Sequence, residues 1–169
     1  MRIDTPGNLA PYRAGCRWLF ALEKARLWLV LQQQILDIQH VGSTAIPGMV
    51  ARPIIDISLA VRDYEQAWEL VDRLKALGYE YEGENPDLRE YSFARRGYIT
   101  YRLFVVEPAN EKFKDRILFR DFLRSHPQTA RSYAELKIRL ARQHHSDLQA
   151  YQWAKLAFVR QVLAQANQN

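Results

Sequence analysis

Apolar and polar positions follow two different periods along the chain, and these periods separate strand segments from helical ones. Short apolar runs bounded by turn residues predict β-strands. The sequences ENPD and RRG provide the turns between the later runs. The predicted strands are residues 35–41, 53–61, 79–82, 91–95 and 99–107. We therefore expect a mixed sheet of four or five strands.

Helical spacing accounts for most of the other residues. Pro11 suits the first position of a helix over residues 11–33, because its missing N–H is harmless there. A second helix is predicted over residues 63–78, and Gly78 ends it. The C-terminal helical segment is divided into residues 111–125, 128–143 and 146–166. This order predicts an α/β (α+β) sandwich with helices packed mainly on one side of the sheet.

The length and composition of the chain fit a single domain over residues 1–169. A chain of 169 residues that is 48% hydrophobic can form one core but is too short for two comfortable domains. No window approaches the roughly 18 apolar residues of a membrane span, and the N-terminus lacks the apolar segment of a signal peptide. The sequence therefore predicts a cytoplasmic protein with no membrane partner, and it leaves the oligomeric state open.

The formal net charge of +5 fits an anionic partner. Basic residues are spread along the chain, whereas a nucleic-acid-binding arm would cluster them. We therefore expect a phosphorylated small molecule or nucleotide as the partner and treat nucleic acid as the minor alternative.

Polar residues concentrate where strands 35–41 and 53–61 meet their connecting loop. Gly42 permits close approach of the backbone, and Ser43 offers a hydroxyl and an N–H to a phosphate; Thr44 follows them. Asp56 lies on the second strand, where a buried carboxylate needs a metal or another cation. This arrangement predicts a site that holds a phosphate beside a metal-binding carboxylate.

Three further side chains near this seam or in the first helix have alternative interpretations. His40 is an acid, a base or only a hydrogen-bonding residue at the end of a strand. Arg52 has a planar fork that clamps a phosphate or pairs with Asp56. Glu23 lies on an apolar helix face, so it forms a salt bridge at the edge of the core or serves as a metal ligand.

A repeated tyrosine-lysine spacing marks the last two predicted helices. Lys137 follows Tyr133 by one helical turn, and Lys155 follows Tyr151 in the same way. Either lysine alone is explained by a stem that lies along apolar surface while its ammonium group reaches water. The two lysines together favour an arrangement in which both ammonium groups face one anion in the same cleft as Ser43.

The stretch HVGSTAIPGMVARPIIDI resembles the signature of the GrpB family, also called UPF0157. FRDFLRSHPQTARSYAELKIRLA and YQWAKLAFV are similar to the C-terminal half of that family. The resemblance implies a nucleotidyltransferase-like fold, in which a Gly-Ser pair precedes a strand with two carboxylates. Fusions of GrpB domains to dephospho-CoA kinase imply a link to coenzyme A metabolism.

Two departures bear on what the resemblance implies about activity. Ser58 stands where nucleotidyltransferases carry their second carboxylate, so at most one metal ion is expected. Many relatives also have a histidine-rich strand where this chain has residues 101–107. Any chemistry of those histidines is missing here.

Two hypotheses follow. In the first, the protein binds a nucleotide or another phosphorylated ligand, with Mg²⁺ as a candidate cofactor, and transfers a nucleotidyl group. Asp56 and His40 are then the catalytic candidates, and Asp56 and Glu23 are the candidate metal ligands. In the alternative, the protein is a catalytically inactive module that binds a phosphorylated ligand. A structure that places a second carboxylate, Glu23 or Glu107, beside Asp56 would favour the first hypothesis.

Overall fold

The computed structural model describes residues 9–168, and within them the chain forms one five-stranded sheet. Its strands are β1 (Ile35–Val41), β2 (Ile54–Val61), β3 (Glu80–Asn85), β4 (Glu90–Arg95) and β5 (Thr100–Val106). In space they follow the order β1-β2-β5-β4-β3. β2 and β5 are parallel, and the other neighbouring strands are antiparallel. The expected mixed sheet is confirmed.

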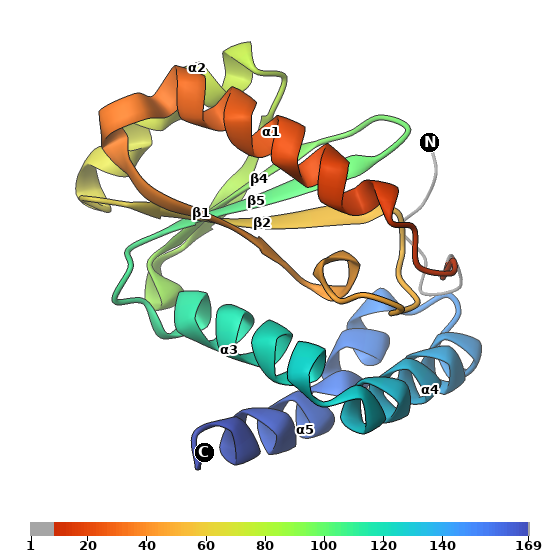
Figure 1. Ribbon diagram of the computed structural model, residues 1–169. Coiled ribbons are helices and arrows are strands. Elements are labelled where there is room, and N and C mark those ends of the chain that lie inside the picture. Colours follow the sequence, from red (N-terminus) through yellow and green to blue (C-terminus); the bar gives the residue numbers. More distant parts are fainter. Residues whose placement is uncertain (1–8, 169) are drawn as a thin grey trace.

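The helices cover both faces of this sheet (Figure 1). α1 (Gly15–Leu31) and α2 (Leu70–Ala76) lie on one face. α3 (Glu111–Ser125), α4 (Pro127–Gln143) and α5 (Leu148–Ala166) lie on the other side. The expectation that helices pack mainly on one side is wrong, because β2 is buried along nearly its whole length and a strand of this kind needs cover on both faces. None of the described helices is both long and apolar enough to cross a bilayer.

Two of the predicted helices begin more than two residues later than expected. α1 begins at Gly15 rather than at Pro11. Ala10 pairs with Ala51 through two backbone hydrogen bonds of 2.9 Å, which hold the chain extended just before the helix. The segment predicted as a helix from residue 63 starts as a 3₁₀ helix, η3 (Glu65–Glu69), and becomes α-helical at Leu70.

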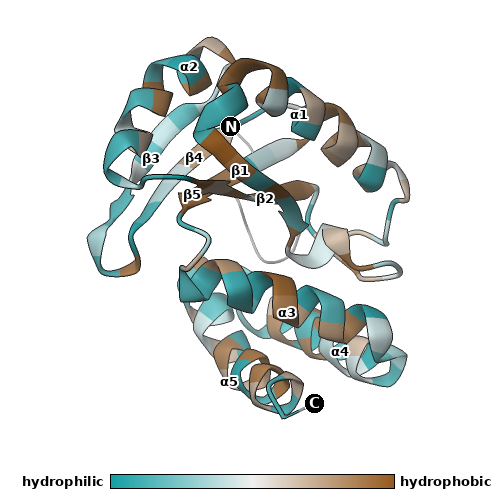
Figure 2. Ribbon diagram, turned by 60° about the vertical axis from the view of Figure 1, so that its left-hand side comes forward, coloured by the Kyte–Doolittle hydropathy of each residue, from teal (hydrophilic) through white to brown (hydrophobic). Residues whose placement is uncertain are grey.

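The main hydrophobic core lies between the sheet and helices α1 and α2. Side chains alternate across a strand, so every second residue of the central strands faces this core. These residues include Ile55, Ile57 and Leu59 of β2 and Leu103 and Val105 of β5, all fully buried. Figure 2 shows hydrophobic segments on the central strands and hydrophilic turns along α3 and α4.

The opposite face of the sheet is partly polar, and α3 meets it through arginine side chains. Arg116 donates to Glu90 of β4 at 2.6 Å, and its guanidinium lies 4.1 Å from the centre of the Phe104 ring. Arg120 donates to Gln39 of β1 at 2.7 Å. Charged hydrogen bonds therefore attach α3 to a face that apolar contacts alone could not cover.

Side chains also occupy backbone acceptors of β1, which is an edge strand. Lys24 donates to the carbonyl oxygen of Ile38 at 2.9 Å, and Arg120 donates to that of His40 at 2.9 Å. Engaged acceptors and nearby cations make an edge strand a poor template for pairing with another chain.

Glu23 is buried between α1 and the sheet. Its carboxylate accepts a hydrogen bond of 3.0 Å from the Tyr79 hydroxyl and pairs with Arg95 at 2.5 Å. Burial of the neutral tyrosine beside this carboxylate raises the pKa of Tyr79 well above its usual range. The salt-bridge interpretation of Glu23 therefore agrees with the structure.

We expect Glu23→Ala to lower the free energy of unfolding by about 3 kcal/mol, because Arg95 is left without its buried counter-ion. Urea denaturation measures this loss. Glu82→Ala is the control, since it breaks a more exposed pair with Arg96 and should cost less than about 1 kcal/mol. Equal losses in the two variants would contradict the assignment of Glu23 as a buried structural ion.

Candidate functional site

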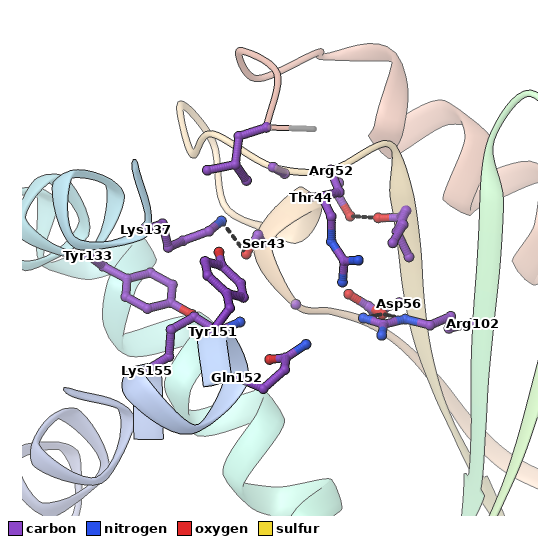
Figure 3. Close-up of a pocket in the computed structure, with 14 residues that line it drawn as sticks. Ser43, Thr44, Arg52, Asp56, Arg102, Tyr133, Lys137, Tyr151, Gln152 and Lys155 are labelled. Carbon is purple, nitrogen blue, oxygen red and sulfur yellow. Dashed lines mark hydrogen bonds and ion pairs between the residues drawn. The ribbon is translucent and has the colours of Figure 1, made fainter. Parts of the chain in front are cut away.

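A pocket of about 150 Å³ lies between the loop after β1, the polar face of the sheet, and helices α4 and α5 (Figure 3). The loop contributes Gly42, Ser43 and Thr44, and the residue before β2 contributes Arg52. All of the ligand-binding residues expected from the sequence line this pocket, together with Asp56. Helices α4 and α5 contribute the last two of these expected residues, Lys137 and Lys155.

The loop after β1 requires a glycine at its first position. Gly42 has φ of 69° and ψ of −170°, a region of backbone space that is essentially confined to glycine. A Cβ at this position would lie 2.3 Å from Oδ2 of Asp56. The absence of a side chain therefore lets the loop approach the carboxylate of β2 closely.

Thr44 and His40 hold this loop in place. The Thr44 hydroxyl donates to the carbonyl oxygen of Ile54 at 2.9 Å, so at the 3.1 Å contact with His40 Nε2 the imidazole N–H is the donor. His40 is buried and stacks on Phe20 of α1 with ring centroids 4.6 Å apart. Burial lowers the pKa of His40 to about 4, and it is therefore neutral near pH 7.

The position of His40 bears on the two interpretations of its role. The imidazole is committed to Thr44 and packs toward α1, and it is not among the residues that line the pocket. A ligand in the pocket would meet Thr44 instead. The structure supports the hydrogen-bonding interpretation of His40 over the acid-base one.

Asp56 finds its cation on the neighbouring strand. Nε and Nη2 of Arg102 lie 2.7 and 2.6 Å from Oδ1 of Asp56, and the two residues are register partners in the parallel pair β2 and β5. Sequence reasoning missed Arg102 as a site residue, although it lies in the strand where many relatives have histidines. The sequence does not reveal which strand lies beside β2, so it could not pair these residues.

The carboxylates expected to share a metal with Asp56 lie elsewhere. Glu23 pairs with Arg95 on the face of the sheet that α1 covers, so the structure does not bring it to Asp56 as a shared metal ligand. Glu107 pairs with Arg89 at 3.1 Å. Among residues 9–168, no three His, Cys, Asp or Glu side chains form a group that could hold a metal ion.

These donors do not fit a Mg²⁺ ion held by the protein. Mg²⁺ sites use carboxylates and other oxygen ligands in octahedral geometry. The part of the chain that the structure describes gives the pocket one carboxylate, Asp56, and the guanidinium of Arg102 already neutralises it. We therefore assign no step to a metal ion.

Lys137 connects α4 to the loop. Its ammonium group donates to Ser43 Oγ at 2.7 Å and to the carbonyl oxygen of Val50, and the residue is only 2% exposed. Burial lowers the pKa of Lys137 to about 7, and nearby Lys155 lowers it further. Burial, followed by the charges of Arg52 and Arg102, lowers the pKa of Lys155 to about 8.

Each of these lysines lies against the tyrosine one turn before it. Lys137 Nζ is 5.5 Å from the centre of the Tyr133 ring, and Lys155 Nζ is 4.4 Å from that of Tyr151. Contacts of this kind favour a cation over the ring face. The tyrosine-lysine spacing in the sequence therefore reports a real side-chain pairing, and both tyrosines also line the pocket.

The charges around the pocket are strongly unequal. Arg52, Arg102, Lys137 and Lys155 come from four different segments of the chain, and among residues 9–168 Asp56 is the single acidic residue in the lining. Burial is the main reason why the pKa values of the two lysines are low, and repulsion from the neighbouring cations lowers them further. An anion bound among them would relieve this repulsion.

The chain matches a family of known proteins along almost all of its length. The family model described as GrpB protein matches residues 6–165. UPF0157 protein BH1888 of Halalkalibacterium halodurans is 33% identical, with 96% of this chain and 88% of that protein covered. The crystal structure of conserved protein GrpB from Enterococcus faecalis is similar with a TM-score of 0.85 and 27% identity, over 94% of this chain and 96% of that one.

Some relatives are longer than this chain. UPF0157 protein YqkA of Bacillus subtilis is 40% identical over 82% of this chain, but the match spans only 42% of its own length. UPF0157 protein PA4798 of Pseudomonas aeruginosa is also 40% identical, over 87% of this chain and 62% of its own length.

The contact between residue 42 and Asp56 predicts that Gly42→Ala destabilises the fold more than Gly48→Ala. Gly48 also has a positive φ, of 76°, but no atom lies within 4 Å of a Cβ placed there. The backbone cost alone is about 1–3 kcal/mol, and Gly42→Ala adds a clash with Asp56. Urea denaturation of the two variants compares them. Equal losses of stability would contradict the close packing of the loop on Asp56.

Burial of Lys137 predicts a pH dependence of stability. Its pKa is about 7 in the folded protein against an ordinary value of 10.5, so between these values the unfolded chain binds more protons. The free energy of unfolding therefore rises with pH across this window. For Lys137→Met, the free energy of unfolding measured by urea denaturation should rise less steeply from about pH 7 to pH 9. The same slope in both proteins would show that Lys137 is not desolvated.

Proposed function

The chain belongs to the GrpB family, and we propose that it binds a phosphorylated small molecule or nucleotide through the phosphate group. The observation that carries this proposal is the convergence of two arginines and two lysines on one pocket, whose described lining holds a single carboxylate. The guanidinium groups of Arg52 and Arg102 are planar and can each donate two hydrogen bonds to phosphate oxygens. The ammonium groups of Lys137 and Lys155 act as compact positive charges. Ser43 adds a hydroxyl that Lys137 already orients.

The size of the pocket supports recognition of the phosphate end of a ligand. Pockets that enclose a whole drug-sized molecule have volumes of about 300–1,000 Å³. The pocket here, at about 150 Å³, is smaller. We propose that the phosphate enters among the cations while the rest of the ligand extends outside. Nucleotides, sugar phosphates and coenzyme A precursors are the classes to compare.

The site favours binding over nucleotidyl transfer. A two-metal transfer site needs carboxylates that bridge both ions. Ser58, which replaces the second carboxylate, is fully buried and lies 3.5 Å from Arg116 of α3, and it is absent from the pocket lining. The module hypothesis therefore has the stronger support. Within this proposal, the assignment of a nucleotidyltransferase-like fold rests on the sequence resemblance alone.

We predict that sulfate or inorganic phosphate binds the protein in the presence of EDTA. Lys155→Met should weaken binding by roughly 10- to 100-fold, because hydrogen bonds to charged groups contribute about 1.5–3 kcal/mol. Lys75→Met is the matched control, since Lys75 is an exposed lysine that pairs with Asp72 on α2. Titration calorimetry measures both. Equal affinities in the two variants would contradict anion binding at this pocket.

Replacement of Asp56 separates the anion pocket from a metal site. Without a metal, Asp56→Asn removes a negative charge from the pocket, so the variant should bind sulfate at least as tightly as the wild type. If Asp56 held an essential Mg²⁺, the same change would abolish ligand binding. Calorimetry with EDTA and then with Mg²⁺ distinguishes these outcomes, and binding that requires both Mg²⁺ and Asp56 would contradict the proposal.

A further inference from the structure

We propose that the outer face of α1 is the interface of a homodimer, in which α1 packs against α1 of a second copy. α1 lies on the outside of the molecule, on the face of the sheet opposite to α4 and α5 (Figure 1). Large apolar side chains on its outer face are exposed to solvent. Their exposed fractions are 75% for Trp18, 70% for Leu22, 46% for Trp28 and 73% for Leu29.

These residues form a second apolar stripe on the helix. The inner stripe, which includes Cys16, Leu27 and Leu31, is buried against the sheet. A surface helix of a globular protein normally carries one apolar stripe and a polar face opposite to it. Trp18, Ala21, Leu22, Ala25, Trp28 and Leu29 are all exposed and recur at helical spacing. A helix that is apolar on both faces is expected to have a partner on each.

The area of the outer stripe is enough for a dimer. A tryptophan alone can bury 150–250 Å², so these six side chains offer on the order of 600 Å² per copy. Two copies would then bury about 1,200 Å², at the lower limit of standard stable interfaces and above most crystal contacts. Scattered apolar surface residues need no partner, but a patch of about 600 Å² is as large as the largest one on a typical monomer, and such patches are often functional.

The arrangement of sizes along the stripe suits a second copy of the same helix. Ala21 and Ala25 lie near its middle, with Trp18 and Leu29 toward its two ends. In an antiparallel pair around a two-fold axis, Trp18 meets Leu29 of the other copy while Leu22 meets Ala25. Large residues then face small ones at the centre, which permits close packing. An isologous contact of this kind closes after two copies.

The charges near the stripe are compatible with antiparallel packing. Arg17 is the exposed charged residue closest to its N-terminal end. In the antiparallel arrangement Arg17 approaches the C-terminal turn of the partner helix, where the carbonyl groups carry partial negative charge. The dipoles of the two helices also point in opposite directions, so the positive end of each lies beside the negative end of the other. The stripe itself contains no ionised side chain that the contact would have to bury.

Sedimentation velocity over a dilution series tests the proposal on the full chain. The wild type is expected to be a dimer, and Leu22→Glu should shift it to a monomer because a charge is placed in the buried contact. Trp153→Glu is the matched control, since Trp153 is 64% exposed on α5, outside the stripe, and should leave the dimer intact. Circular dichroism checks that both variants keep the fold of the wild type.

Three results would overturn the proposal. They are a wild type that stays monomeric throughout the series, a Leu22→Glu variant that still dimerises, and a Trp153→Glu variant that dissociates to the same extent as Leu22→Glu. A monomeric wild type whose tryptophan fluorescence shifts on anionic phospholipid vesicles, with a smaller shift in Trp18→Phe, would assign the face to a membrane surface instead. The proposal does not depend on the anion pocket, which lies on the other side of the sheet.

Discussion

The ion pair between Asp56 and Arg102 determines what the pocket can bind. A carboxylate on a buried strand must be compensated, and the parallel pairing of β2 with β5 places the guanidinium within 2.7 Å of it. Because the neighbouring strand supplies this cation, the fold does not need a metal ion to tolerate Asp56. Among the described residues of the lining, the cations outnumber the carboxylate, and this imbalance of charge is the basis of the proposed anion binding.

The C-terminal helices depend on the same polar face. α3 is attached to it by Arg116 and Arg120, whose partners Glu90 and Gln39 lie on strands. α4 reaches the loop after β1 through Lys137, which is buried although its charge is costly to desolvate. A buried lysine whose charged form is disfavoured by desolvation is understandable if the charge serves a ligand. The low pKa of Lys137 and the attraction for an anion thus have one physical origin.

Sequence reasoning located the loop residues well because their chemistry is local. Gly42, Ser43 and Thr44 form one short segment, and Lys137 could be placed by its spacing from Tyr133. Arg102 and Glu23 required long-range information, since the sequence shows neither which strands pair nor which face of the sheet a helix covers. For the same reason the distribution of helices over both faces was missed, whereas the strands themselves followed from their apolar pattern.

The most direct test of the anion pocket is a crystal structure of the protein grown with selenate, whose selenium is located by anomalous scattering. We predict a selenium peak in the pocket, with oxygens in contact with Lys155 and at least one of Arg52 and Arg102, and no divalent cation on Asp56 when Mn²⁺ is also present. A pocket without selenate and a Mn²⁺ ion bound to Asp56 would contradict the account.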